Sequence, residues 1–71
     1  MVLSAMPGTA QSGEAERILE RAVRLHEAGD LDSAIREYNA FLVLEPNVVR
    51  VRSNLGAALA RLGRYDAAIE Q

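Results

Sequence analysis

The sequence repeats itself after 34 residues. When it is shifted by that distance, glycines fall on glycines and apolar or small residues on similar residues. The aligned pairs are Ala22 with Gly56, Leu25 with Leu59, Gly29 with Gly63, Leu31 with Tyr65, Asp32 with Asp66, Ala34 with Ala68 and Ile35 with Ile69. A fixed period of this length is typical of stacked repeat proteins, in which each unit buries its apolar face against a neighbour. The repeat therefore predicts a binding scaffold.

Composition narrows the class of protein further. With 71 residues the chain can form one small domain, and it has no cysteine for a disulfide or a thiolate metal site. The net charge of -2 does not favour a nucleic-acid partner, which usually meets a basic surface. No run approaches the roughly 18 apolar residues of a membrane span, so we expect no membrane insertion.

Helical periodicity and stop signals divide the chain into short helices. Apolar spacing predicts a first helix over residues 14–28, which Gly29 ends. Asp30 is expected to cap a second helix that runs to about Leu44, before Glu45-Pro46. Its expected buried side consists of Leu31, Ala34, Ile35, Tyr38, Phe41 and Leu42. Short connections favour antiparallel neighbours.

The remaining residues predict two more helices. A third helix, capped by Asn47, is expected to run to Gly63, and a fourth to begin near Tyr65 and to last about two turns. Because a helix this short does not persist by propensity alone, we expect a frayed end around residues 67–71 and exposed apolar surface on the third helix.

The first 13 residues contain small residues, Pro7 and two glycines but no charge. They predict a disordered leader of a cytoplasmic protein. The alternative is that residues 8–10, before Gln11, are the end of an export signal whose start lies upstream of Met1, which would make the protein exported or periplasmic.

The two units resemble the tetratricopeptide repeat (TPR) family, whose 34-residue unit is a helix-turn-helix hairpin. The stretch GRYDAAIE, residues 63–70, is especially similar to the family's turn and second helix. The repeat positions that carry the resemblance are Ala22, Gly29, Ala34, Tyr38, Pro46, Gly56, Gly63 and Ala68. The resemblance implies an all-α fold in which antiparallel hairpins stack as the start of a right-handed α-solenoid. Residues 14–48 would form the first hairpin, and residues 49–71 a second hairpin truncated in its second helix.

The resemblance also implies a function. Family members are generally adaptors that hold a peptide or a partner helix on a concave face formed by the first helices of the hairpins. The positions carried over to that face are Glu16, Leu19, Glu20, Val23, His26, Glu27, Arg50, Ser53, Asn54, Ala57, Ala60 and Arg61. Burial against the neighbouring helix is an equally good reading of Leu19 and Val23. Neither can donate a hydrogen bond, which argues against a clamp for a chaperone's terminal carboxylate. An apolar or basic peptide fits better.

Catalysis and metal binding have little support in the sequence. His26 is the only histidine and is expected to face solvent, and Ser33 and Ser53 lie in no nucleophile motif. The glycines Gly29 and Gly63 are isolated turn residues and form no phosphate loop. We therefore expect a protein that is not an enzyme and that needs no cofactor or metal.

Truncation of the second unit leaves two alternatives to the adaptor. Residues 1–47 carry four arginines and eight acidic residues, whereas residues 48–71 carry four and two. This asymmetry fits an ordinary solvated surface, but it also fits self-assembly, in which incomplete repeats pair with another copy. The second alternative is that the chain is the repeat-containing leader of a larger protein.

Overall fold

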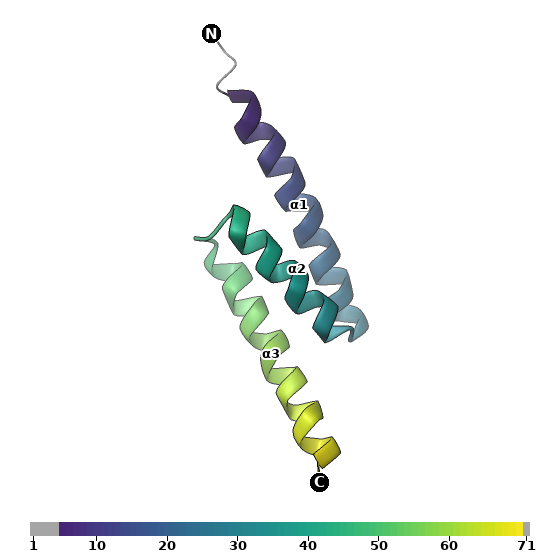
Figure 1. Ribbon diagram of the computed structural model, residues 1–71. Coiled ribbons are helices and arrows are strands. Elements are labelled where there is room, and N and C mark those ends of the chain that lie inside the picture. Colours follow the sequence, from purple (N-terminus) through teal and green to yellow (C-terminus); the bar gives the residue numbers. More distant parts are fainter. Residues whose placement is uncertain (1–4, 71) are drawn as a thin grey trace.

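Three helices make up the part of the chain that the structure describes. The computed structural model describes the backbone of residues 5–70 and the side chains of residues 13–70. The helices are α1 (Ala5–Ala28), α2 (Leu31–Leu44) and α3 (Val49–Glu70). Helix α2 packs antiparallel to both α1 and α3, which therefore run in the same direction (Figure 1). The predicted all-α class and the antiparallel order of neighbours are confirmed for these residues.

The turn between α1 and α2 forms where the sequence predicts it. Gly29 has a φ of 87°, in the left-handed region that a side chain disfavours. Its N–H donates to the His26 carbonyl (3.1 Å), and the Asp30 N–H donates to the Leu25 carbonyl (2.9 Å). This pair of bonds closes the C-terminus of α1 as a Schellman motif. Asp30 then caps α2, because its carboxylate accepts the Ser33 N–H at 3.4 Å.

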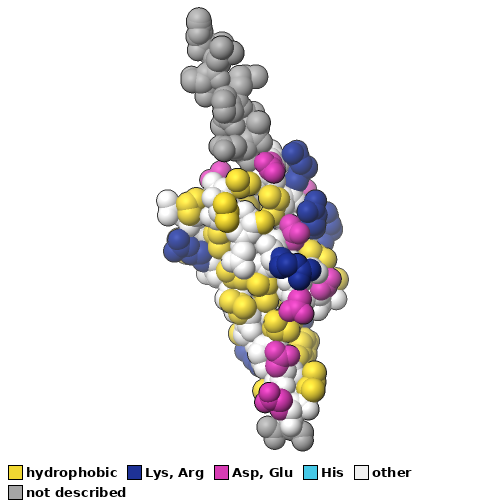
Figure 2. All heavy atoms as spheres, viewed as in Figure 1, with side chains coloured by type: hydrophobic (Ala, Val, Ile, Leu, Met, Phe, Trp, Pro, Cys, Tyr) yellow, Lys and Arg dark blue, Asp and Glu magenta, His cyan; other side chains and the backbone are white. Residues whose placement is uncertain are grey.

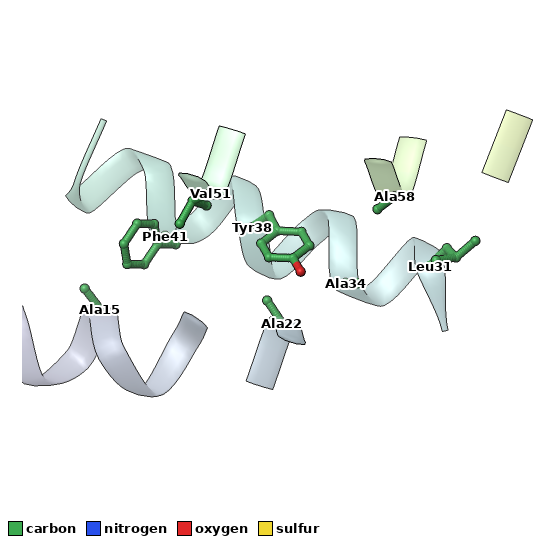
Figure 3. Packing of buried hydrophobic residues seen from close by; sticks show 8 residues of the cluster. All are labelled: Ala15, Ala22, Leu31, Ala34, Tyr38, Phe41, Val51 and Ala58. Atoms are coloured by element: carbon green, nitrogen blue, oxygen red, sulfur yellow. The ribbon is translucent and has the colours of Figure 1, made fainter. Parts of the chain in front are cut away.

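Helix α2 supplies the centre of the core. Its buried residues lie between Ala15 and Ala22 of α1 on one side and Val51 and Ala58 of α3 on the other (Figure 3). The buried residues of α2 are Leu31, Ala34, Tyr38 and Phe41, with Ile35 and Leu42 partly buried beside them. The predicted core side of this helix is thus confirmed. Ala22, Ala34 and Ala58 are fully buried, so the small side chains stand where neighbouring helices approach each other.

The turn between α2 and α3 is held by backbone and arginine contacts. The Glu45 N–H donates to the Phe41 carbonyl (2.8 Å) at the predicted end of α2. Arg52, on the first turn of α3, donates from Nη2 to the Pro46 carbonyl at 2.8 Å. The N–H groups that open α3 donate to the carbonyl of Val48, so the cap position is Val48 rather than the predicted Asn47.

Helix α3 differs from the prediction at Gly63. The expected turn at Gly63 and the fourth helix from Tyr65 do not form, because α3 continues unbroken to Glu70. Gly63 has no positive φ, and residues 63–70 are all exposed. A turn there would need a surface on which a two-turn helix could pack, and continuing α3 adds backbone hydrogen bonds instead. Ala68, which aligns with Ala34 in the 34-residue repeat, is likewise exposed, whereas Ala34 is buried.

Helix α1 also differs from the prediction, because it begins at Ala5 rather than near Glu14. Pro7 falls in its first turn, where the missing N–H has no intrahelical partner to lose. The first four residues of the predicted leader lie outside the described part of the chain, and the alternative of an export signal stays a prediction.

Apolar side chains remain exposed at two places, over the α2–α3 turn and along the C-terminal part of α3 (Figure 2). On α3 these are Leu59, Tyr65 and Ile69, and Ile69 is 82% exposed. Tyr65 and Ile69 continue the helical spacing of Val51, Ala58 and Leu62, which pack on the core. Because α3 projects past the end of α2, no helix of the described residues lies beside this continuation (Figure 1). The predicted exposed apolar surface on the third helix is confirmed. The frayed end predicted around residues 67–71 is wrong as far as Glu70, because α3 stays helical to that residue.

Two glycine substitutions should change stability in opposite directions. In Gly29→Ala, the new Cβ has space but must adopt a positive φ, so we expect a loss of about 1 kcal/mol in the free energy of unfolding. In Gly63→Ala, the Cβ also has space and the backbone is helical, so we expect a gain of about 0.5–1 kcal/mol. Urea unfolding followed by circular dichroism measures both. Destabilisation by Gly63→Ala would mean that a turn forms at this residue in solution.

Candidate functional site

A groove of about 730 Å³ lies between α1 and α3. Its lining residues are Glu16, Leu19, Glu20, Val23 and Arg24 from α1, and Arg50 and Asn54 from α3. The groove therefore takes its walls from the two helices that stand on either side of α2. A smaller hollow of about 250 Å³ shares Glu16, Leu19 and Arg50 with it and extends over Phe41 and Val48, toward the α2–α3 turn.

The two walls of the groove occupy equivalent positions in the 34-residue repeat. Glu16 aligns with Arg50, and Glu20 aligns with Asn54. Because α1 and α3 run in the same direction, equivalent residues come to face a common space. The two walls of the groove are thus formed by equivalent positions of the internal repeat.

The groove combines an apolar base with charged edges. Leu19 and Val23 are partly buried and pack against the core. Glu16, Glu20, Arg24 and Arg50 are exposed. Among the described residues the ion pair within 4 Å is Arg21–Glu37 (3.4 Å), which joins α1 to α2 outside the groove. The charged side chains at the groove can therefore interact with solvent or with a ligand.

A polar cluster lies behind the groove, where the three helices meet. His26 Nδ1 and Tyr38 Oη are 2.9 Å apart, and the two rings meet edge to face with centroids at 5.8 Å. The Arg61 Nη1 donates to the His26 carbonyl oxygen at 3.4 Å, near the C-terminus of α1. A guanidinium at this end of a helix is favourable, because the carbonyl groups there carry partial negative charge. These contacts tie α1 to α2 and to α3.

The Tyr38 hydroxyl is the titratable group that the fold perturbs most clearly. Burial raises the pKa of Tyr38 above its ordinary value of 10.0, the hydrogen bond with Asn54 lowers the pKa, and the charge of Glu27 raises it. The net direction is upward, so the hydroxyl keeps its proton to a higher pH in the folded chain than in the unfolded chain.

Stability should consequently fall at high pH. Above pH 10 the unfolded chain loses the Tyr38 proton while the folded chain still holds it, so the free energy of unfolding decreases as the pH rises. Urea unfolding at about pH 9 and about pH 11 measures this difference. Tyr38→Phe should show a smaller decrease over the same interval, whereas Tyr65→Phe should behave like the wild type. An equal decrease in all three proteins would contradict the assignment to Tyr38.

The structure places part of the predicted face in the groove and part outside it. Leu19, Val23, Arg50 and Asn54 line it, as do Glu16 and Glu20. His26, Glu27, Ser53, Ala57, Ala60 and Arg61 do not. Arg61, one of the residues outside the groove, donates to the His26 carbonyl and so joins α3 to α1. Arg24, which lines the groove, was not predicted.

His26 requires a correction. It was expected to face solvent, but it is half-buried and bonded to Tyr38. A signal for this position exists in the sequence, because His26 follows the buried Ala22 by four residues and so lies on the same helix face.

Other kinds of site have no counterpart among the described residues. Within them, no three His, Cys, Asp or Glu side chains gather closely enough to hold a metal ion. None of the helices searched there has both the length and the apolar character needed to cross a membrane. Comparisons with protein-family models, with curated proteins and with solved structures find no match for the chain.

Proposed function

We propose that this chain is a non-catalytic, TPR-like interaction module that binds a peptide or a partner helix in the groove between α1 and α3. The proposal rests on which helices form the two walls of the groove. Two helices at equivalent positions of one repeat line a common space, as expected for adaptors that present the first helices of their hairpins. The three helices would then be the start of a right-handed solenoid.

The chemistry of the groove supports a polypeptide ligand. Leu19 and Val23 offer an apolar base for one or two side chains, and Asn54 offers an amide that can pair with a peptide backbone. Glu16 and Glu20 stand on the α1 edge as carboxylates without a partner within 4 Å in the described structure. We therefore expect apolar peptides with basic residues to bind better than acidic ones.

The proposal is tested by peptide selection. The whole chain is immobilised and used to select from a random dodecapeptide library displayed on phage, and affinities of the selected synthetic peptides are measured by calorimetry. Asn54→Ala should weaken their binding. Asn39→Ala is the matched control, because Asn39 is exposed on α2 and does not line the groove. If no selected peptide depends on Asn54, the groove is not the binding site.

The exposed end of α3 supports a second candidate, a self-assembly element. Tyr65 and Ile69 extend the stripe that packs on the core, but they are exposed and no helix in the described part of the chain covers them. A second copy that covers them would make stability depend on concentration. Urea unfolding at two protein concentrations about a hundredfold apart separates the candidates. A midpoint that rises with concentration favours assembly, and an unchanged midpoint favours the adaptor.

A further inference from the structure

The hollow at the end of the groove has the size of a single side chain. It holds about 250 Å³ and continues the groove toward the α2–α3 turn. Clefts that enclose a whole small molecule usually hold about 300–1,000 Å³, so this hollow is better suited to one side chain of a bound peptide. Four apolar and three charged residues line it: Ala15, Leu19, Phe41 and Val48, and Glu16, Glu45 and Arg50.

The apolar residues of the hollow belong to the core or pack against it. Phe41 of α2 and Ala15 of α1 are buried in the core cluster, where the Phe41 ring lies toward the small Ala15 side chain (Figure 3). Leu19 and Val48 are partly buried and pack against the same cluster. These residues form an apolar surface on which the carbon chain of a long side chain can pack.

The charged residues of the hollow leave an excess of negative charge. Glu16 and Arg50 are exposed, whereas Glu45 is half-buried. The backbone of Glu45 is held beside Phe41, because the Glu45 N–H donates to the Phe41 carbonyl at 2.8 Å. Among the described side chains the ion pair within 4 Å is Arg21–Glu37, so the carboxylates of Glu16 and Glu45 have no such partner there. A basic side chain would therefore meet two carboxylates against one guanidinium.

We propose that this hollow is an anchor pocket that takes one basic side chain, arginine or lysine, of the peptide bound in the groove. The inference rests on the proposed function, and it names the residue type recognised at this end of the groove. The carbon chain of the anchor packs on Leu19 and Phe41, and its cationic group lies near the carboxylates of Glu16 and Glu45. Glu45 is the new element of the site, because it stands at the end of α2 rather than on a wall helix.

A double-mutant cycle between protein and peptide tests the pocket. The peptides are those selected against the whole chain whose binding depends on Asn54. Each basic residue is replaced in turn by a neutral residue of similar shape, citrulline for arginine or norleucine for lysine. At one position, Glu45→Gln should weaken the basic peptide by about two- to fivefold, the range of an exposed ion pair, and leave the neutral peptide unchanged.

Glu70→Gln is the matched control for this cycle. It removes the same charge from an exposed residue of α3 that lines neither the groove nor the hollow. It should change the affinity of the basic peptide by less than Glu45→Gln does. Equal effects of the two variants would mean that the net charge of the chain, and not the pocket, selects basic peptides.

The proposed function and the anchor pocket can fail separately. If no selected peptide depends on Asn54, the groove is not the binding site. If peptides depend on Asn54 but contain no basic residue coupled to Glu45, the groove binds peptides and the anchor pocket is wrong.

A second measurement tests the pocket without a selected peptide. N-acetyl-arginine amide is titrated into the labelled chain to about 20 mM and followed by NMR, because a single side chain is expected to bind with only millimolar affinity. The backbone amide signals of Glu45 and Val48 should shift more than with N-acetyl-citrulline amide, and Glu45→Gln should remove the difference. Equal shifts with the two compounds would overturn the proposal.

Discussion

Tyr38→Ala should unfold at a much lower urea concentration than the wild type. Tyr38 is among the largest fully buried side chains and lies between Ala22 of α1 and Val51 of α3 (Figure 3). Truncating a buried aromatic ring to alanine costs about 3–5 kcal/mol. A domain of this length has a total stability of roughly 4–10 kcal/mol, so the substitution removes a large part of it. The loss is measured by urea unfolding followed by circular dichroism at about 222 nm. The signal at this wavelength reports the helix content of all three helices together.

The same truncation at the other tyrosine is the control. Tyr65 is 52% exposed and lies on the part of α3 that projects beyond α2. Tyr65→Ala should therefore change the free energy of unfolding by less than about 1 kcal/mol. If Tyr38→Ala kept a cooperative transition with a midpoint near that of the wild type, Tyr38 could not be the centre of the core.

Ala34→Leu should give the second largest loss. Ala34 is fully buried on α2 in the core shared by the three helices, and a small side chain there lets helix axes approach each other. Three extra carbon atoms in a packed interior force the helices apart or the side chain out of its preferred rotamer. We expect a loss of about 1–3 kcal/mol in the free energy of unfolding, measured in the same way.

Ala40→Leu is the matched control, because it makes the same change on the same helix at an exposed position. Leucine and alanine are both good helix formers, so we expect a change within about 0.5 kcal/mol. Equal effects of the two substitutions would mean that Ala34 does not lie at a close approach of two helices.

Local signals were sufficient to predict α2. Gly29 can adopt a positive φ, Asp30 caps the following helix, and Pro46 disfavours a helical residue before it. Each of these effects is decided within a few residues of the chain, so the sequence shows both ends of this helix. Its apolar spacing likewise predicted which side is buried, since both neighbouring helices pack on that side.

The same reasoning was wrong at Gly63 because a tertiary contact decides the outcome there. Gly63 and Gly29 have similar sequences after them, but among the described residues only those after Gly29 form a helix that packs against the preceding one. Without that packing, the residues after Gly63 extend α3. A local pattern cannot report whether a turn will have a surface to pack against.

The sequence predicted the groove-lining residues that occupy equivalent repeat positions. It did not predict the contacts between side chains of different helices. The repeat placed Leu19, Val23, Arg50 and Asn54 on a common face, and all four line the groove. The bond between His26 and Tyr38 depends on how α1 and α2 are rotated about their axes. The contact of Arg61 with the His26 carbonyl depends in addition on the position of α3.

The central position of α2 has a consequence for how the molecule opens. Helix α2 has a neighbour on each side, whereas α1 and α3 each have α2 as their main support. Local opening of an outer helix breaks one interface, but exposing α2 breaks two, so free energies of local opening increase from the outer helices toward the middle. The groove is built from the two helices that open most easily. Its walls can therefore adjust to a bound segment by small displacements while α2 keeps them in register.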